Sequence, residues 1–144
     1  MAKGTEKKEF LIPTDLAEVQ KTSAKVLSFL KPLQVGEACL FDIRLCLEEA
    51  LINAMKYGNH LQKNLKVQLR VEADPGEEIR ISVEDKGGGF DVKKLEDCTH
   101  QKNLLKNRGR GVYLIRQLMD RVQYNAKGNT ILMVKRLHSD VCHS

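Results

Sequence analysis

The chain has 144 residues, of which 42% are hydrophobic and 30% are charged, a composition typical of one folded domain and not of a disordered segment. No apolar run approaches the roughly 20 residues that a membrane-spanning helix needs, and the charged N-terminus lacks the apolar stretch of a secretory signal, so we expect a cytoplasmic protein with no membrane contact. The net charge of +5 favours anionic partners such as nucleotide phosphates, while the lack of tryptophan and an aromatic content of 5% argue against direct nucleic-acid binding.

The N-terminal half of the chain predicts one short strand and two helices. Residues 9–12 are an expected strand, which Pro13 ends. The next helix has Thr14 or Asp15 as its expected N-cap and an apolar face made by Leu16, Val19, Val26, Leu27, Phe29 and Leu30. From Glu37 onward, apolar residues recur every three or four positions, which predicts a long helix that ends at Gly58 and Asn59.

The four cysteines form no C-x-x-C pair, which argues against a zinc site or a disulfide framework. Cys39 and Cys46 are seven residues apart, so both lie on one side of the second helix. We expect them to be small buried thiols.

The C-terminal half predicts two hairpins separated by a loop and a helix. Residues 65–71 and 79–83 alternate apolar with polar side chains, which predicts an antiparallel hairpin. Residues 85–110 are polar and punctuated by glycine, which predicts a long loop that is either a functional lid or disordered. A helix at 111–119 and a hairpin of 122–125 with 130–136 follow. This order predicts an α+β fold, a two-layer sandwich of a mostly antiparallel sheet with helices on one face.

The first motif that carries chemistry lies on the second helix. Glu49 and Asn53 are four residues apart, so both side chains project from one face. An amide oxygen is a hard ligand suited to Mg²⁺, and a carboxylate one turn earlier can accept a proton from a hydroxyl group or water. Glu48 points about 100° away from Glu49. A polar stripe on a surface helix is the alternative interpretation.

The second motif, Asp85-Lys86-Gly87-Gly88-Gly89-Phe90-Asp91, directly follows a predicted buried strand. The Asp85 carboxylate ends an apolar run and needs a partner there, for which an exocyclic amine is one candidate. Gly87 and Gly89 let the backbone pass close to a flat ring. A flexible turn with a solvated aspartate is the alternative.

The third motif, Asn107-Arg108-Gly109-Arg110-Gly111-Val112-Tyr113, ends the loop and opens a helix. Free amides at a helix N-terminus form an anion site, and Arg108 and Arg110 can add charge-assisted contacts. No Lys-Ser/Thr pair follows, so this is not a Walker loop. A dinucleotide fingerprint is also excluded, because no parallel β-α-β unit surrounds the glycines.

In this order the three motifs resemble the histidine-kinase-like ATPase superfamily, and the likeness covers residues 10–137. The chain looks most like its small stand-alone members, the anti-sigma-factor serine/threonine kinases. Tyr57, where relatives often carry histidine, and Arg110, bulkier than is usual between the two glycines, depart from the pattern without removing a required group. The resemblance implies an ATP-binding domain at 9–137 with a lid at about 91–108, between a flexible N-terminus (1–8) and a flexible tail (138–144).

The resemblance also implies a role for each candidate site residue. Asn53 would hold Mg²⁺ and Glu49 would be the general base. Asp85 would recognise the adenine amine as a hydrogen-bond acceptor. Thr130 would support the adenine site, with an ordinary strand threonine as the alternative. The implied ATP-binding set is Asn53, Asp85, Gly87, Gly89, Arg108, Gly109, Arg110, Gly111 and Thr130.

The function implied by the resemblance is that of an ATP-dependent serine/threonine protein kinase. It would phosphorylate an anti-anti-sigma factor, sequester a sigma factor and form a homodimer. The alternative is a nucleotide-gated partner-binding switch without kinase activity. We do not expect a sensor histidine kinase, which needs a helix bearing a phosphoacceptor histidine, because only about nine residues precede the first strand. Neither do we expect a gyrase or chaperone ATPase, because the chain has no transducer or clamp domain.

Overall fold

The computed structural model describes residues 4–87 and 107–137, the side chains of 107–110 excepted. These residues form the strands β1 (Glu6–Pro13), β2 (Lys66–Asp74), β3 (Glu78–Glu84), β4 (Arg121–Tyr124) and β5 (Thr130–Arg136). The helices are α1 (Glu18–Leu30), α2 (Glu37–Asn53) and α4 (Asn107–Leu118), with a 3-10 turn η1 (Lys31–Leu33) after α1 and a π-helical turn η2 (Ala54–Gly58) after α2. None of the helices in these ranges is long and apolar enough to cross a membrane.

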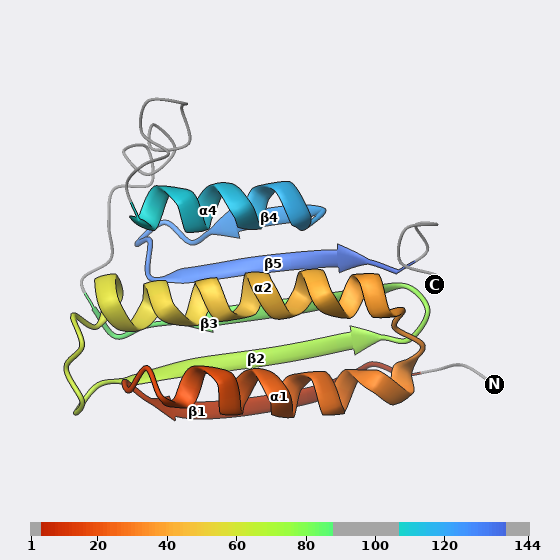
Figure 1. Cartoon of the computed structure of the whole chain (residues 1–144), viewed down its shortest axis with the longest axis horizontal. Coiled ribbons are helices and arrows are strands. Elements are labelled where there is room, and N and C mark those ends of the chain that lie inside the picture. The colour runs from red at the N-terminus through yellow and green to blue at the C-terminus, as the bar shows by residue number, and fades with distance from the viewer. Residues whose placement is uncertain (1–3, 88–106, 138–144) are drawn as a thin grey trace.

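The strands form one sheet in the order β1-β2-β3-β5-β4, and each neighbouring pair is antiparallel. The helices lie on one face of this sheet (Figure 1). This confirms the predicted two-layer α+β fold. In the β3–β5 register Glu84 lies opposite Thr130, so the end of β3 meets the beginning of β5. The predicted functional motifs come together at these strand ends.

The core lies between the sheet and the helices. Period-two alternation in β2 and β3 turns one side of each strand inward, and the helices cover it with their apolar stripes. Cys39 and Cys46 of α2 are both fully buried, which confirms the prediction. Burial, reinforced by the nearby Asp42 carboxylate, raises the pKa of the Cys46 thiol to about 12, so this thiol stays protonated at neutral pH. The largest fully buried side chains are Val26, Leu30, Ile43, Leu47, Leu51, Met55, Leu69, Ile79, Ile81, Ile115, Met133 and Leu137.

The start of α1 differs from the prediction. The helix begins at Glu18, and its N-cap residue Ala17 makes no side-chain capping bond. Thr14 is buried and its hydroxyl donates to the Leu65 carbonyl at 2.6 Å, because a long-range partner competes with the local cap. Asp15 accepts from the Ala17 amide at 3.0 Å before the helix starts. Leu16 precedes the helix and is 45% exposed, so its predicted place on the apolar face is wrong.

The start of α4 also differs from the prediction. The helix begins at Asn107, four residues before Gly111, so both glycines of the third motif lie inside it. Glycine disfavours a helix by about 1 kcal/mol, but packing of α4 against α2 outweighs that local preference. Residues 4–8 of the predicted flexible N-terminus are described, and β1 already begins at Glu6. The predicted lid, apart from residues 107 and 108, and the whole of the predicted tail lie outside the described residues.

Two groups of charged side chains tie elements together. The nearly buried Lys135 of β5 donates to the Leu118 carbonyl at 2.6 Å and lies 3.4 Å from Asp42 of α2. It thereby joins the end of α4 to β5 and α2. Arg80 of β3 contacts Glu72 and Glu78 and pairs with Asp74 at 2.7 Å. The hydrogen bond from Arg80 lowers the pKa of the Asp74 carboxyl below its ordinary value.

Candidate functional site

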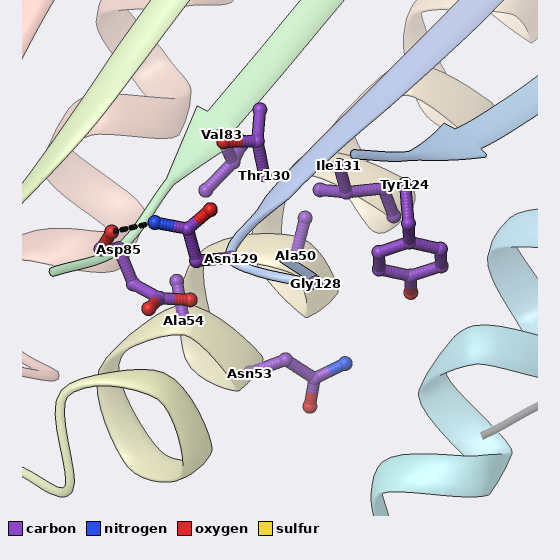
Figure 2. A pocket seen from close by; sticks show the side chains of 10 residues that line it. All are labelled: Ala50, Asn53, Ala54, Val83, Asp85, Tyr124, Gly128, Asn129, Thr130 and Ile131. Carbon is purple, nitrogen blue, oxygen red and sulfur yellow. Dashed lines mark hydrogen bonds between the residues drawn. The ribbon is translucent and has the colours of Figure 1, made fainter. Parts of the chain in front are cut away.

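The predicted site residues gather where the end of α2, the end of β3 and the turn between β4 and β5 meet. Figure 2 shows Asn53 on α2 facing a hollow whose other wall includes Asp85, Asn129 and Thr130. Two hollows open here and both include Asn53. The first is lined by Ala50, Asn53, Ala54, Val83, Asp85, Tyr124, Gly128, Asn129, Thr130 and Ile131. The second is lined by Glu49, Ile52, Asn53, Lys56, Tyr57, Gly111 and Leu114.

Asp85 is 5% exposed and directly follows the last residue of β3. Its Oδ1 accepts the Gly87 amide at 2.9 Å. The carboxylate lies directly against Gly58, and a Cβ on Gly58 would overlap it. A Cβ on Gly87 would likewise overlap the Gly58 carbonyl. The two glycines therefore permit a close approach that fixes the carboxylate, and the alternative of a solvated aspartate in a flexible turn is wrong for Asp85.

The second wall of the first hollow comes from the turn between β4 and β5. Gly128 has a φ of 81°, a left-handed conformation that glycine adopts without strain. The side-chain oxygen of Asn125 accepts hydrogen bonds from the backbone amides of Gly128, Asn129 and Thr130 at 2.8 to 3.2 Å. The turn is thereby fixed, and it places Thr130 in the hollow with Tyr124.

Glu49 and Asn53 lie one turn apart on α2 and meet Gly111 of α4. A Cβ added to Gly111 would lie 2.7 Å from Glu49 Oε2 and 3.1 Å from Asn53 Nδ2. At Gly111, α4 therefore packs close to both side chains. Because α4 starts at Asn107, the Gly111 amide lies beyond the first four free amides of the helix. Its observed contribution is close approach.

Glu48 lies in a different environment from its neighbour. It lines a neighbouring hollow together with Leu16, Val19 and Gln20 of the α1 region, whereas Glu49 lines the hollow of Asn53 and Gly111. The two hollows share Ile52 and Lys56 but not the glutamates. The helical geometry predicted this separation. Glu49 is therefore the carboxylate that shares a cavity with the amide of Asn53.

Several residues of the site were not singled out from the sequence. Lys56 lines the second hollow, and its ammonium lies 5.7 Å from the centre of the Tyr57 ring. Its position three residues after Asn53 was an available signal. Asn129 and Tyr124 carried no recognisable signal, because a turn and a short edge strand place them there. Gly89 lies outside the described residues. Arg108, Gly109 and Arg110 belong to α4, but their side-chain environment is not described.

The donor set suits a hard cation held with few protein ligands. Among the described residues, no three Asp, Glu, His or Cys side chains gather as a metal site. Magnesium is commonly bound through one or two protein oxygens, with water and substrate phosphates completing its coordination. The side chain of Asn53, which lies beside Glu49 and Gly111, offers one such oxygen.

Comparison with known proteins places this arrangement in a family. The model of the histidine kinase-like ATPase domain matches residues 12–135. That range contains α2, the end of β3, α4 and the β4–β5 turn. The family expected from the motif order is thereby confirmed.

Curated relatives share one name. Serine-protein kinase RsbW of Bacillus subtilis is 30% identical over 106 residues, covering 69% of this chain and 66% of that protein. The protein of the same name from Bacillus pumilus is 33% identical over 107 residues, with the same coverage. The chain therefore spans just under two thirds of the length of these relatives.

A solved structure shares the fold. The crystal structure of the RsbU and RsbW domains of a Mycobacterium tuberculosis protein matches with a TM-score of 0.59 and 17% identity. The match covers 91% of this chain and 32% of that chain. At this identity the likeness concerns the arrangement of sheet and helices.

Proposed function

We propose that this chain, which belongs to the histidine kinase-like ATPase domain family, is an ATP-dependent protein kinase that phosphorylates serine or threonine. The observation that carries the proposal is the joining of two hollows at Asn53. Asp85 and Thr130 line one, and Glu49 and Gly111 line the other. A nucleotide spanning both would have its base at Asp85 and its phosphates beside Glu49.

The first hollow suits the adenine ring. Asp85 is buried and held by the Gly87 amide, so its carboxylate is an immobile acceptor for the exocyclic amine. Val83, Ala50 and Ile131 give the hollow apolar walls, as flat aromatic ligands require. Thr130, the first residue after the β4–β5 turn, would support this contact. Gly87 and Gly89 would shape the pocket around it.

The second hollow suits the phosphates and the reacting groups. Asn53, with the phosphates and water, would hold Mg²⁺, which when bound neutralises charge on the phosphates. The first amides of α4 are an anion site. On that basis we assign Gly109 and the neighbouring Arg108 and Arg110 to the phosphates. Lys56 lines the same hollow and adds a positive charge to it.

Glu49 would act as the general base. In the reaction the substrate hydroxyl oxygen forms a bond to the γ-phosphorus while the bond to the bridging oxygen of ADP breaks. The hydroxyl proton passes to the Glu49 carboxylate. Phosphoryl transfer depends mainly on positioning and charge stabilisation, and the close contact of Gly111 with Glu49 and Asn53 provides a fixed geometry.

The proposed partners are supported by the names of the relatives and by the motif order. Those at about 30% identity are named serine-protein kinases, and the motif order resembles the anti-sigma-factor kinases. We assign an anti-anti-sigma factor as the phosphorylated partner and a sigma factor as the sequestered one. The protein would act in the cytoplasm as a homodimer.

A pair of neighbouring glutamates tests the catalytic proposal. Glu49→Gln retains the shape and removes the proton acceptor, so phosphorylation should slow by roughly 10² to 10⁴-fold with little change in ATP affinity. Glu48→Gln is the matched control, because Glu48 lines a different hollow. The assay is transfer of labelled phosphate from ATP to a purified anti-anti-sigma factor of the same organism. Transfer by Glu49→Gln at the wild-type rate would refute the role of Glu49.

Magnesium dependence tests the other half of the site. Asn53→Ala should abolish the enhancement of ATP binding by Mg²⁺ and leave weak, metal-independent binding. Calorimetry with and without Mg²⁺ measures this. Wild-type protein that binds ATP but transfers no phosphate to any such partner would indicate a nucleotide-gated binding switch instead.

A further inference from the structure

Two buried asparagine side chains hold the backbone on either side of Asp85. Asn59 is fully buried and Asn129 is 9% exposed. Asparagine is mostly found on protein surfaces, and a buried amide is stable only when its polar atoms are paired. The two residues are 70 positions apart in the numbering of the chain. Both nevertheless bond to the same short segment.

Asn59 holds the segment from the side of α2. Its side-chain oxygen accepts the Lys86 amide at 2.8 Å, so it binds the peptide that directly follows Asp85. Its Nδ2 donates to the Thr14 hydroxyl at 2.9 Å and to the Lys66 carbonyl at 3.2 Å. Asn59 is thereby anchored to the end of β1 and the start of β2 while it fixes Lys86.

Asn129 holds the segment from the side of β5. Its carbonyl accepts the Asp85 amide at 2.9 Å. Its side chain donates to the Asp85 carbonyl at 3.2 Å, the bond drawn in Figure 2. Asn125 in turn fixes Asn129, whose Oδ1 accepts from the Asn125 side chain at 2.7 Å.

The backbone of Asp85 is therefore bonded at its amide, at its carbonyl and at the next amide. Its carboxylate is bonded to the Gly87 amide and packed against Gly58. Few ways remain for this carboxylate to turn. A fixed acceptor favours a ligand that presents a donor at one point and rejects a ligand that presents an acceptor there.

We propose that Asn59 and Asn129 are positioning residues that set the specificity of the site for a 6-amino purine over a 6-oxo purine. They hold Asp85 so that its carboxylate meets the exocyclic amine of adenine. In hypoxanthine an oxygen replaces that amine and faces the carboxylate. This inference rests on the proposed binding of ATP. It adds Asn59, which lines neither hollow, and Asn129, which lines the first hollow and acts on specificity through its bonds to Asp85.

The test compares affinities for ATP, inosine triphosphate and inorganic tripolyphosphate in the presence of Mg²⁺, by calorimetry on the full chain. Asn59→Ala and Asn129→Ala should each weaken ATP binding by roughly 10-fold, because the fixed acceptor is lost. Binding of inosine triphosphate and tripolyphosphate should stay within about twofold of wild type. The expected result is a lower ratio of the affinity for ATP to the affinity for inosine triphosphate, and not a general loss of affinity for all three ligands.

Thr14→Val is the matched control. It removes the hydroxyl that accepts from Asn59 but leaves in place the bond that the Lys86 amide donates to Asn59. It should lower the melting temperature as a buried polar substitution does, yet retain the preference for ATP. Asn129→Ala removes the side-chain bond to the Asp85 carbonyl and the bond from Asn125, but it leaves the backbone bond to the Asp85 amide in place. It keeps the test valid if Asn59→Ala does not fold.

The outcomes separate this inference from the proposed function. Wild-type protein that binds ATP and inosine triphosphate equally would overturn both the role of Asp85 and this inference. Wild-type protein that prefers ATP, with the same preference in both asparagine variants, would overturn this inference alone. Equal weakening of all three ligands would also overturn it, since that pattern shows a general structural role.

Discussion

Replacement of Gly111 with alanine should change the rate of phosphoryl transfer without lowering the stability of the fold. Gly111 lies within α4, where alanine is favoured over glycine by about 1 kcal/mol. The new Cβ would lie 2.7 Å from Glu49 Oε2 and 3.1 Å from Asn53 Nδ2. Both atoms are the ends of half-buried side chains, which can give way. The free energy of unfolding should therefore stay the same or rise by up to about 1 kcal/mol.

The same substitution should impair phosphoryl transfer. To reach an ordinary contact of 3.4 Å, the Glu49 carboxylate must withdraw by about 0.7 Å from the 2.7 Å that the new methyl group would impose. A misplacement on the order of 1 Å lowers a rate about 10²-fold. We expect phosphorylation to slow by roughly 10- to 100-fold, while the melting temperature stays constant or rises by roughly 3 °C.

The assay pairs thermal unfolding with labelled phosphate transfer. Gln117→Ala is the control, because Gln117 is an exposed residue of the same helix and lines neither hollow. It should change neither property appreciably. A Gly111→Ala variant with the full wild-type rate would refute the close fit. Destabilisation by more than about 2 kcal/mol, the range of overpacked cores, would show instead that Gly111 packs in a rigid core.

Three further predictions follow from individual contacts. Asp85→Asn retains an acceptor for the Gly87 amide but replaces the other oxygen with a donor, so ATP affinity measured by calorimetry should fall roughly 10- to 100-fold without loss of stability; unchanged affinity would contradict the adenine contact. Lys135→Met leaves Asp42 and the last carbonyl of α4 without their ammonium partner, and denaturant unfolding should show a loss of about 1–3 kcal/mol, a prediction that wild-type stability would contradict. The pKa of Asp74 is depressed, so its pairing stabilises the fold above the ordinary carboxyl pKa of 3.8 and is lost as the pH falls through the folded value. Asp74→Asn should therefore be less stable than wild type at pH 7 and equal to it at strongly acidic pH. A pH-independent difference would contradict the assignment.

Much of the fold could be predicted from local sequence patterns. Period-two alternation in residues 65–71 and 79–83 predicted β2, β3 and their hairpin, because a strand with one buried face must alternate. The helical period predicted α2, and the predicted end at Gly58 and Asn59 is the end of the π-helical turn η2 that continues it. The shared face of Glu49 and Asn53 followed from the same geometry. These are short-range relations, and residues close in sequence determine them.

The helix termini could not be predicted from the sequence. Thr14 was a sound N-cap by type, but its hydroxyl bonds to Leu65, 51 residues away. The glycines of α4 suggested a late helix start, yet packing on α2 extends the helix back to Asn107. In both places a tertiary contact outweighs a local preference of about 1 kcal/mol.

By itself the sequence determined the α+β class, the strand pairs joined by short turns, and the family to which the three motifs belong. Only the tertiary structure decided that Gly111 closes over Glu49 and Asn53, and that Asn59 and Asn129 hold the Asp85 segment across 27 and 44 residues. Periodicity and turn chemistry are written into neighbouring residues, because each element must bury its own apolar face. Contacts between distant residues leave no such local pattern, because they arise only when the sheet and helices pack together.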